Sequence, residues 1–304
     1  MHFDPYLALA GLLVGFTVGL TGMGGGALMT PILVLFFRVA PLAAVSSDLL
    51  AAVIMKPIGA GVHLRRGTVN TEMVRWLMLG SVPSAFAGVL VLKALGGGES
   101  VENVIKTALG VALVLAATTL VARAVLGVRR TAMSQRGTQA PPLHVRPLAT
   151  VAVGVVGGLL VGMTSVGSGS LIIVLLLFLY PTVRPSQLVG TDLLQAIPLV
   201  ASAALGHMLF GDLKLGLTAS LLVGSIPGVY IGARISTRAP GKVVRPALAL
   251  VLAASGLKLL EVGNVQLGIL LVGAVLLGPA AWALVRATGG LRFLPRSQPS
   301  AFPS

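Results

Sequence analysis

The sequence contains no cysteine and little charge. Without cysteine the chain can form no disulfide, no CxxC redox pair and no cysteine-attached haem. Charged residues make up 10% of its 304 residues, against about 25% in ordinary soluble domains, whereas 56% are hydrophobic and mean hydropathy is +0.98. A soluble fold cannot bury so much apolar surface, which excludes a soluble enzyme or binding domain.

Patterns for catalysis and metal binding are also absent from the sequence. The four histidines are scattered, and no HExxH, GxSxG or GxxxxGK[ST] motif occurs. We therefore expect no catalytic residue, no metal site and no cofactor. Because the chain has no ATP-binding motif, any energy for its work has to come from an ion gradient, a substrate gradient or a partner.

The chain does contain long charge-free stretches, most of them near the roughly 20 apolar residues that a membrane-spanning helix needs. They are 7–37, 76–92, 107–122, 147–183, 215–233 and 262–285. The net charge of +14 comes largely from arginines between these stretches, above all at 129–146 and 234–245. Such clusters are typical of cytoplasmic loops, and no aromatic residues interleave with them, so we expect no nucleic-acid partner.

The two halves of the chain resemble each other. Glycine, threonine and leucine positions between Gly11 and Leu28 recur between Gly154 and Leu171 at an offset of 143. Proline, aspartate and histidine positions then recur at an offset of 144, pairing Pro41, Asp48 and His63 with Pro185, Asp192 and His207. Scarce residues at a fixed offset indicate an internal duplication.

The predicted fold is an all-α polytopic membrane protein with two five-segment repeats and one further C-terminal helix. The expected apolar segments are 6–20, 26–37, 43–62, 72–93 and 102–126, then 148–163, 168–180, 187–207, 214–233 and 243–260, and finally 266–286. The expected domains are a first repeat at 1–126, a cytoplasmic linker at 127–147, a second repeat at 148–262, and a last helix with a cytoplasmic tail at 263–304.

The arginine distribution predicts that the two repeats have opposite orientations. If the first two segments of each repeat enter and leave the membrane as a pair, the arginine-rich loops and the basic tail all lie on one side, as the positive-inside rule requires. Each repeat then crosses an odd number of times, which inverts the second relative to the first.

Two glycine-rich interruptions, TGMGGGA and TSVGSGS, mark the candidate substrate site. Non-helical backbone inside a bilayer requires protein or a water-filled cavity around it, and the helix that follows offers N–H groups and a positive dipole end to an oxyanion. Hydroxyls at Thr30 and Ser170 could add donors. The candidate substrate-binding residues are Thr21, Gly24, Gly25, Gly26, Lys56, Thr164, Ser165, Gly167, Ser168 and Gly169. By contrast, Gly11, Gly15, Gly19, Gly154, Gly158 and Gly162 are favoured as helix-packing positions.

Five other polar residues are candidates for coupling or gating. Asp48 and Asp192 could be proton carriers or hydrogen-bond anchors, or else first-turn acids beside a hydroxyl cap. Gln195 shares a helix face with Asp192 and could line the cavity. His63 and His207 could form a pH-sensitive gate, although ordinary interfacial histidines are favoured. Lys56, which has Val200 as its counterpart, is expected to be a buried cation without a protein partner and to pair with a cavity anion.

Two pairs of segments, one pair in each half, resemble the TauE/SafE sulfite exporter family. In the first half they are GLTGMGGGALMTPIL and PLAAVSSDLL, and in the second half VGGLLVGMTSVGSGS and VGTDLLQA. The likeness extends from about Tyr6 to Val285 and is strongest at 24–26 with Pro31 and at 190–192. It implies a membrane transporter that moves sulfite, sulfonates or related organosulfur anions across the bacterial inner membrane. The second copy departs from the glycine triplet at Ser168 and has Val174 in place of Pro31.

The sequence therefore favours a secondary transporter for a small anion, with that anion and the lipid bilayer as partners and a proton or other ion as a coupling partner. An anion channel or an accessory membrane subunit is the main alternative. A membrane-embedded enzyme is less favoured, because no nucleophile, base or metal ligands occur at fixed spacing. Substrate, transport direction, coupling ion and oligomeric state stay open.

Overall fold

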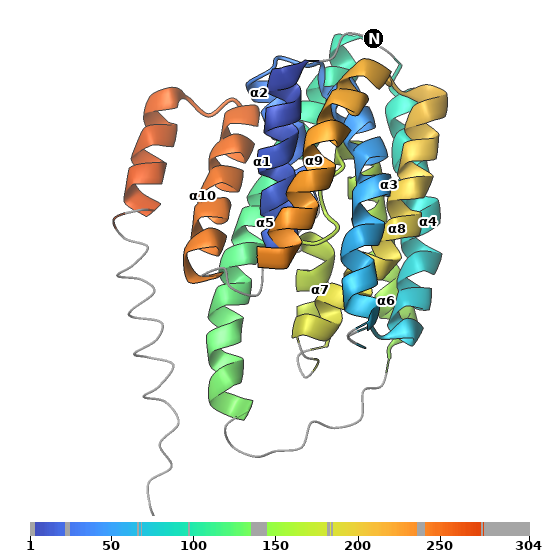
Figure 1. Ribbon diagram of the computed structural model, residues 1–304, viewed down its shortest axis with the longest axis vertical. Helices are drawn as coiled ribbons and strands as arrows, with labels where there is room; N and C mark the ends of the chain where they lie inside the picture. The colour runs from blue at the N-terminus through green and yellow to red at the C-terminus, as the bar shows by residue number, and fades with distance from the viewer. Residues whose placement is uncertain are drawn as a thin grey trace, which may run out of the picture.

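The computed structural model describes residues 4–21, 25–65, 67, 69–96, 98–134, 145–180, 183, 185–235, 241–274 and 276. Within these ranges every regular element is a helix, and the helices stand roughly side by side as one bundle (Figure 1). Six of them are long and apolar enough to cross a membrane. The predicted fold class, an all-α polytopic membrane protein, is confirmed.

Among the described residues, the first half of the chain contributes five helices and the second half five more, followed by a shorter one. They are α1 Pro5–Thr21, α2 Gly26–Leu35, α3 Pro41–Arg65, α4 Thr71–Ala94, α5 Glu99–Ser134, α6 Pro147–Thr164, α7 Leu171–Leu179, α8 Pro185–Phe210, α9 Leu215–Ile235 and α10 Gly241–Leu259. A shorter apolar helix, Asn264–Ala274, follows. The one clear departure from the expected boundaries is α5, which extends to Ser134 and therefore into the segment expected to be linker.

Proline explains where several of these helices begin. Pro5, Pro41, Pro147 and Pro185 are the first residues of α1, α3, α6 and α8. A proline at this position loses no hydrogen bond, since the first N–H groups of a helix have no partner within the helix, and its fixed φ suits the helix. The start of α4 is instead capped by the Asn70 side chain, which accepts from the Met73 N–H at 2.9 Å.

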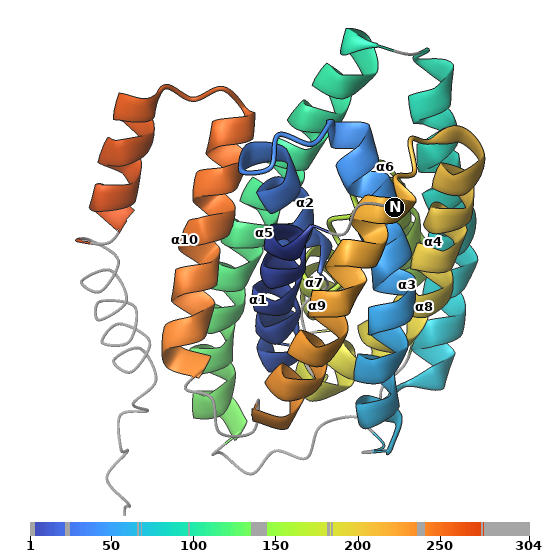
Figure 2. The same cartoon turned by 45° about the horizontal axis from the view of Figure 1, so that its top comes forward.

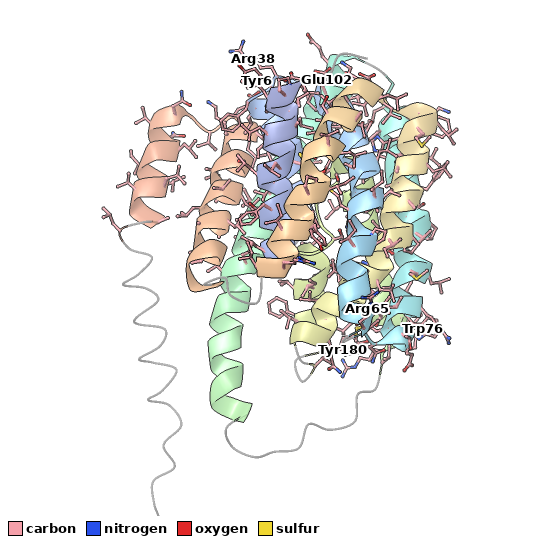
Figure 3. All side chains as sticks on the ribbon, viewed as in Figure 1. Tyr6, Arg38, Arg65, Trp76, Glu102 and Tyr180 are labelled. Carbon is pink, nitrogen blue, oxygen red and sulfur yellow. The ribbon has the colours of Figure 1, made fainter. Side chains whose placement is uncertain are left out.

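Corresponding helices of the two halves run in opposite directions. Figure 3 places Tyr6, at the start of α1, at the top of the bundle, and Tyr180, just after α7, at the bottom. The N–H of Arg146, which precedes α6, donates to the Tyr180 hydroxyl at 2.8 Å, so α6 starts at the bottom. Likewise α3 runs from Arg38 at the top to Arg65 at the bottom, whereas α8 starts near Tyr180.

The halves interlock through glycine-rich helix faces. The first helix of each half packs on the fourth helix of the other half, α1 on α9 and α6 on α4; α1 and α9 lie side by side in Figures 1 and 2. A β-carbon on Gly15 would lie 2.4 Å from the Ser225 carbonyl oxygen, and one on Gly162 would lie 2.1 Å from that of Ala85. The described glycines of these two faces are therefore packing positions, as expected, because they allow backbones to touch.

Two large apolar clusters among the described residues meet at the second glycine-rich interruption, and a third, small one gathers Ala51, Met55 and Val229. One gathers side chains of α3, α4, α6, α7 and α8, including Ile172. The other gathers side chains of α1, α2, α5 and α10, and it includes Val166, from the segment between α6 and α7. This segment thus lies at the boundary between the two clusters, in the interior of the bundle.

Candidate functional site

The segment Ser165–Ser170, between α6 and α7, is the structural centre of the candidate site, and we call it the serine–glycine loop. Its backbone is non-helical: Ser165 ends α6 with a left-handed φ of 61°. Gly167 and Gly169 have φ of 142° and 85°, values that favour glycine. Ser165, Ser168 and Ser170 are all buried. The predicted break in the helix is therefore present, and protein surrounds it.

Three charged side chains hold the serine–glycine loop at three successive points. The Ser165 hydroxyl donates to Oδ2 of Asp48 at 2.7 Å. The ammonium group of Lys56 donates to the Ser168 hydroxyl, and the Gly169 N–H donates to Oδ2 of Asp192. Asp48 and Lys56 lie on α3, and Asp192 lies on its counterpart α8. Both halves of the chain therefore fix the conformation of this one loop.

Asp48 connects the two interruptions. Its Oδ2 also accepts from the hydroxyl of Thr30, on α2, at 2.9 Å. Its Oδ1 is the nearest neighbour of a β-carbon placed on Gly25, at 3.8 Å. A β-carbon on Gly26 would lie 2.0 Å from the Ser165 carbonyl oxygen, so the start of α2 touches the start of the serine–glycine loop. The two glycine breaks therefore meet in space, beside a buried carboxylate.

Asp192 has a different set of partners. Its Oδ1 accepts from the side-chain amide of Gln195 at 2.9 Å, and the amide oxygen of Gln195 accepts from the Ser81 hydroxyl, on α4, at 2.9 Å. All three side chains are buried. Neither Asp192 nor Asp48 lies in the first turn of its helix. The first-turn capping alternative is therefore wrong, and both carboxylates accept hydrogen bonds in the interior of the bundle.

Lys56 is buried, with 7% of its surface exposed, at a position deep within α3. Our expectation of a buried cation with no protein partner is wrong, since Ser168 accepts from its ammonium group. Lys56 also interacts electrostatically with Asp192 and Asp48. A hydroxyl leaves the positive charge in place, so the ammonium can still attract an anion.

The remaining predicted site residues have more local roles, or lie outside the described structure. The Thr164 hydroxyl donates to the Leu160 carbonyl at 2.6 Å and accepts from the Val166 N–H at 3.1 Å, so it serves the local backbone. Gly24 and the side chains of Thr21 and His63 lie outside the described residues.

His207 is not the interfacial histidine that the sequence favoured. It is fully buried, its Nδ1 lies 2.8 Å from the Ser46 hydroxyl, and its Nε2 lies 2.8 Å from the Gly162 carbonyl oxygen. It therefore ties α8 to α3 and α6.

Sequence reasoning missed two supporting hydroxyls, Ser81 and Ser46. Ser81 positions Gln195, and Ser46 contacts His207. Ser81 has a matching Ser225 in the second repeat, a signal that could have marked it. Ser46 is matched by Gly190, so the repeat gave no indication of its role.

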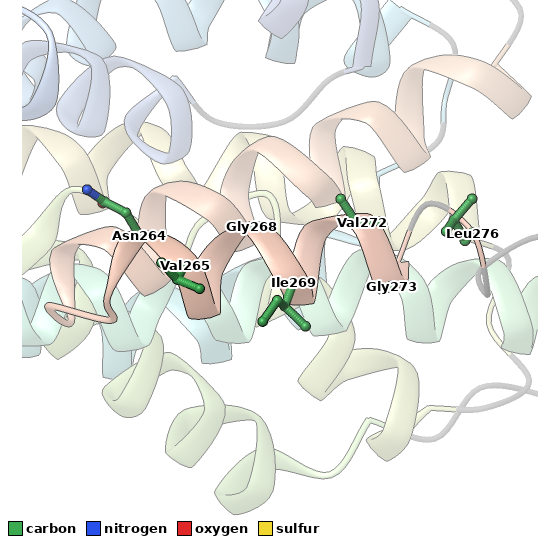
Figure 4. Close-up of a pocket in the computed structure, with 7 residues that line it drawn as sticks. All are labelled: Asn264, Val265, Gly268, Ile269, Val272, Gly273 and Leu276. Atoms are coloured by element: carbon green, nitrogen blue, oxygen red, sulfur yellow. The ribbon is translucent and has the colours of Figure 1, made fainter.

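A groove with a volume of about 640 Å³ lies away from the glycine breaks, along the C-terminal helix (Figure 4). Its lining is apolar apart from Asn264, with Val265, Ile269 and Val272 among its side chains. It contains no charged group that could bind an anion, and in a membrane such a surface faces lipid or another helix.

Comparison with known proteins identifies the family. The model of the sulfite exporter TauE/SafE family matches residues 7–259. The chain belongs to the TauE/SafE family. The probable membrane transporter protein YjnA of Bacillus subtilis is 38% identical over 255 residues, which cover 84% of this chain and 98% of that protein.

Two further probable membrane transporter proteins of Bacillus subtilis are similar to the chain. YdhB is 27% identical over 259 residues, covering 84% of this chain and 99% of that protein, and YunE is 24% identical over 274 residues, covering 84% and 97%. No solved structure matches. This TauE/SafE protein is thus a multi-pass membrane transporter by family.

Proposed function

We propose that this TauE/SafE protein is a secondary transporter, an exporter or permease of a small anion in the bacterial inner membrane. The favoured substrates are sulfite, sulfonates and related organosulfur anions. The family's description names sulfite export, which supports this substrate class. By the positive-inside rule, we place the arginine-rich side of the bundle in the cytoplasm. This is the side on which α3 ends at Arg65.

The buried ammonium of Lys56 beside the serine–glycine loop is the observation that carries this proposal. A charged group in the middle of a membrane protein is costly and is retained for a function. Here the charge lies at a non-helical segment between α6 and the short helix α7, and many transporters bind their substrates at such interrupted helices. An anion beside Lys56 would gain two donors, the ammonium group and the hydroxyl of Ser168, whose oxygen accepts from Lys56 while its proton can point to the anion.

The short helix α7 supplies a second attraction for an anion. It begins at Leu171, directly after the serine–glycine loop, so its N-terminal end lies at the candidate site. An anion near such a helix start is stabilised by about 0.3 to 2 kcal/mol. In the structure, Asp192 already accepts from Gly169 close to this point. A substrate anion would therefore share or replace that carboxylate's interactions.

Transport by purified protein in proteoliposomes tests the proposal. Sulfite, sulfoacetate, taurine, thiosulfate, sulfate and chloride are offered in turn, and uptake is compared with efflux stimulated by unlabelled anion on the opposite side. We expect saturable uptake of a sulfur oxyanion and stimulation by anion on the opposite side. Uptake without such stimulation would indicate an anion channel, and transport of none of these anions would refute the proposal.

Lys56→Met tests the role of the buried cation. We expect it to reduce anion uptake by about tenfold or more, the effect of roughly 1.4 kcal/mol of lost interaction, at unchanged yield of monodisperse protein. Lys106→Met, which removes a half-buried lysine from α5, is the matched control and should transport normally. Equal transport by both variants would move the substrate site away from Lys56.

A further inference from the structure

We infer that transport is coupled to a proton carried by Asp48, whereas Asp192 remains a fixed negative charge. This inference rests on the proposed function and adds its coupling ion. The two residues occupy matching positions in the repeats, yet the chemistry of their partners differs, and the difference decides which of them can change its protonation state.

The groups that hydrogen-bond to Asp48 are compatible with both its ionised and its protonated carboxyl group. Both of its partners, Thr30 and Ser165, are hydroxyls. A hydroxyl can donate to a carboxylate and, after rotation, can accept from a carboxylic acid. Protonation of Asp48 therefore needs only the rotation of an O–H bond. It breaks no backbone hydrogen bond, because neither partner of Asp48 is a backbone group.

Asp192 is bound by groups that require the ionised form. Its two oxygens accept from the backbone N–H of Gly169 and from the side-chain amide of Gln195. An N–H cannot accept a hydrogen bond, and the amide oxygen of Gln195 is engaged by Ser81. A proton on either oxygen would compete with one of these N–H groups, leaving a buried donor unsatisfied at a cost comparable to a lost hydrogen bond. Asp192 is thus the permanent counter-charge of Lys56.

The charge balance of the buried cluster then depends on Asp48. Lys56 interacts electrostatically with both aspartates. With Asp192 ionised, it is neutralised, so an ionised Asp48 leaves the cluster with one negative charge and a protonated Asp48 leaves it neutral. A substrate anion beside Lys56 is repelled in the first case and accepted in the second. Because Oδ1 of Asp48 lies beside Gly25, at the candidate site, this repulsion acts at short range.

No other described charged group competes for this role. Asp48 faces Lys56 of its own helix and, through it, Asp192 of α8. The described part of α2 has no ionisable side chain. The described charged groups of the other helices around α3 lie at helix ends or are held by hydrogen bonds. On α9, Arg234 lies over the Tyr230 ring, and on α5 the first two turns contain Glu99, Glu102 and Lys106. On α8, His207 lies between Ser46 and Gly162.

By linkage, anion binding and proton binding at Asp48 must strengthen each other. Proton and anion therefore occupy the site together and cross together, as a symport. Affinity for the anion should rise as pH falls, because protonation of Asp48 removes the repelling charge. An inward proton gradient would then drive accumulation of the anion inside a vesicle.

The test measures exchange and accumulation separately, in proteoliposomes whose membrane potential is clamped at zero. The probe is labelled sulfoacetate, or thiosulfate if the transport panel selects it, since both stay fully ionised near neutral pH. We expect wild-type protein to exchange the probe without a gradient. With the outside about one pH unit more acidic, it should accumulate the probe about tenfold, the limit for one coupled proton.

Asp48→Asn keeps the hydrogen-bonding shape of the carboxylic acid and removes its titration. We expect this variant to retain at least about half of the exchange rate, while its accumulation ratio falls to about one, since linkage requires a titrating site. Asp212→Asn, the same substitution at a half-exposed surface residue, should behave as wild type.

Four outcomes are decisive. Exchange by wild type without any response to the pH gradient would overturn the coupling and leave the proposed function standing. Gradient-driven accumulation by Asp48→Asn would assign the proton to another residue and overturn the inference. No exchange of any anion in the panel would overturn the proposed function, and the inference with it. Accumulation by wild type alone, with exchange retained in Asp48→Asn, would support both.

Discussion

Asp48 and Asp192 occupy corresponding positions in the two repeats, but different chemical groups donate hydrogen bonds to them. Asp48 accepts from two hydroxyls, contributed by α2 and by the serine–glycine loop. Asp192 accepts from a backbone N–H and from a side-chain amide, which Ser81 holds in place. The repeat has thus kept the carboxylates and changed what surrounds them.

A duplicated residue can thus keep its position in the fold while its chemical role diverges. Hydroxyl partners leave a carboxylate free to gain a proton, and N–H partners hold it in the ionised form. The lysine of the cluster is not duplicated, since Val200 stands at the matching position of α8. Each repeat thus supplies one aspartate, Asp48 or Asp192, whereas only the first repeat supplies the cation, Lys56. In our inference, Asp48 is then the one position of the site at which the charge changes.

The largest effect, a loss of folded protein, is expected from a substitution near Asp48, where the two glycine-rich interruptions touch. In Gly26→Ala the new methyl group would lie 2.0 Å from the Ser165 carbonyl oxygen. Backbone has to move to relieve this contact, so we expect a severe loss of folded protein. Gly25→Ala is the matched control, because its nearest neighbour would be 3.8 Å away. The yield of monodisperse protein on size-exclusion chromatography measures both, and equal yields would show that the breaks are not in tight contact.

A smaller but still large effect is expected from Asp192→Ala. The Gly169 N–H and the Gln195 amide would lose their acceptor in the interior, at about 1 to 3 kcal/mol for each unsatisfied group. Asp48→Ala leaves only hydroxyls, which can rotate toward other acceptors. Thermal unfolding in detergent should therefore show a larger drop in Tm for Asp192→Ala than for Asp48→Ala. The reverse order would contradict the assignment of Asp192 as the fixed anchor.

The smallest effects are expected from the partners of each carboxylate. Ser81→Ala removes one hydrogen bond to Gln195 and should lower the free energy of unfolding by about 1 kcal/mol. It should leave the pH dependence of transport unchanged. Thr30→Val removes a hydroxyl from Asp48 and, although similarly mild for stability, should shift the pH dependence of anion uptake. A shift with Ser81→Ala and none with Thr30→Val would exchange the roles of the two aspartates.

Much of the architecture could be predicted from the sequence because it follows from local composition. Charge-free stretches near membrane-spanning length form helices in a bilayer wherever they occur along the chain, and the described helices follow the predicted segments closely. The glycine breaks were also predictable, since TGMGGGA and TSVGSGS disfavour helix by themselves. The end of α5 was misplaced because the basic residues after 126 were taken for a loop, although arginine is a good helix former.

The partners of the buried polar residues could not be predicted in the same way. Whether Asp48 would meet Ser165, or Lys56 would meet Ser168, depends on contacts between segments more than a hundred residues apart in the chain. The sequence suggested a lone cation in Lys56 and an interfacial histidine in His207, and both expectations failed for this reason. By itself the sequence determined a membrane-embedded helical protein with two related halves and two broken helix pairs, because hydrophobicity and glycine content act locally. Only the tertiary structure decided which carboxylate lies among hydroxyls and which among N–H groups, because that depends on how the two halves pack.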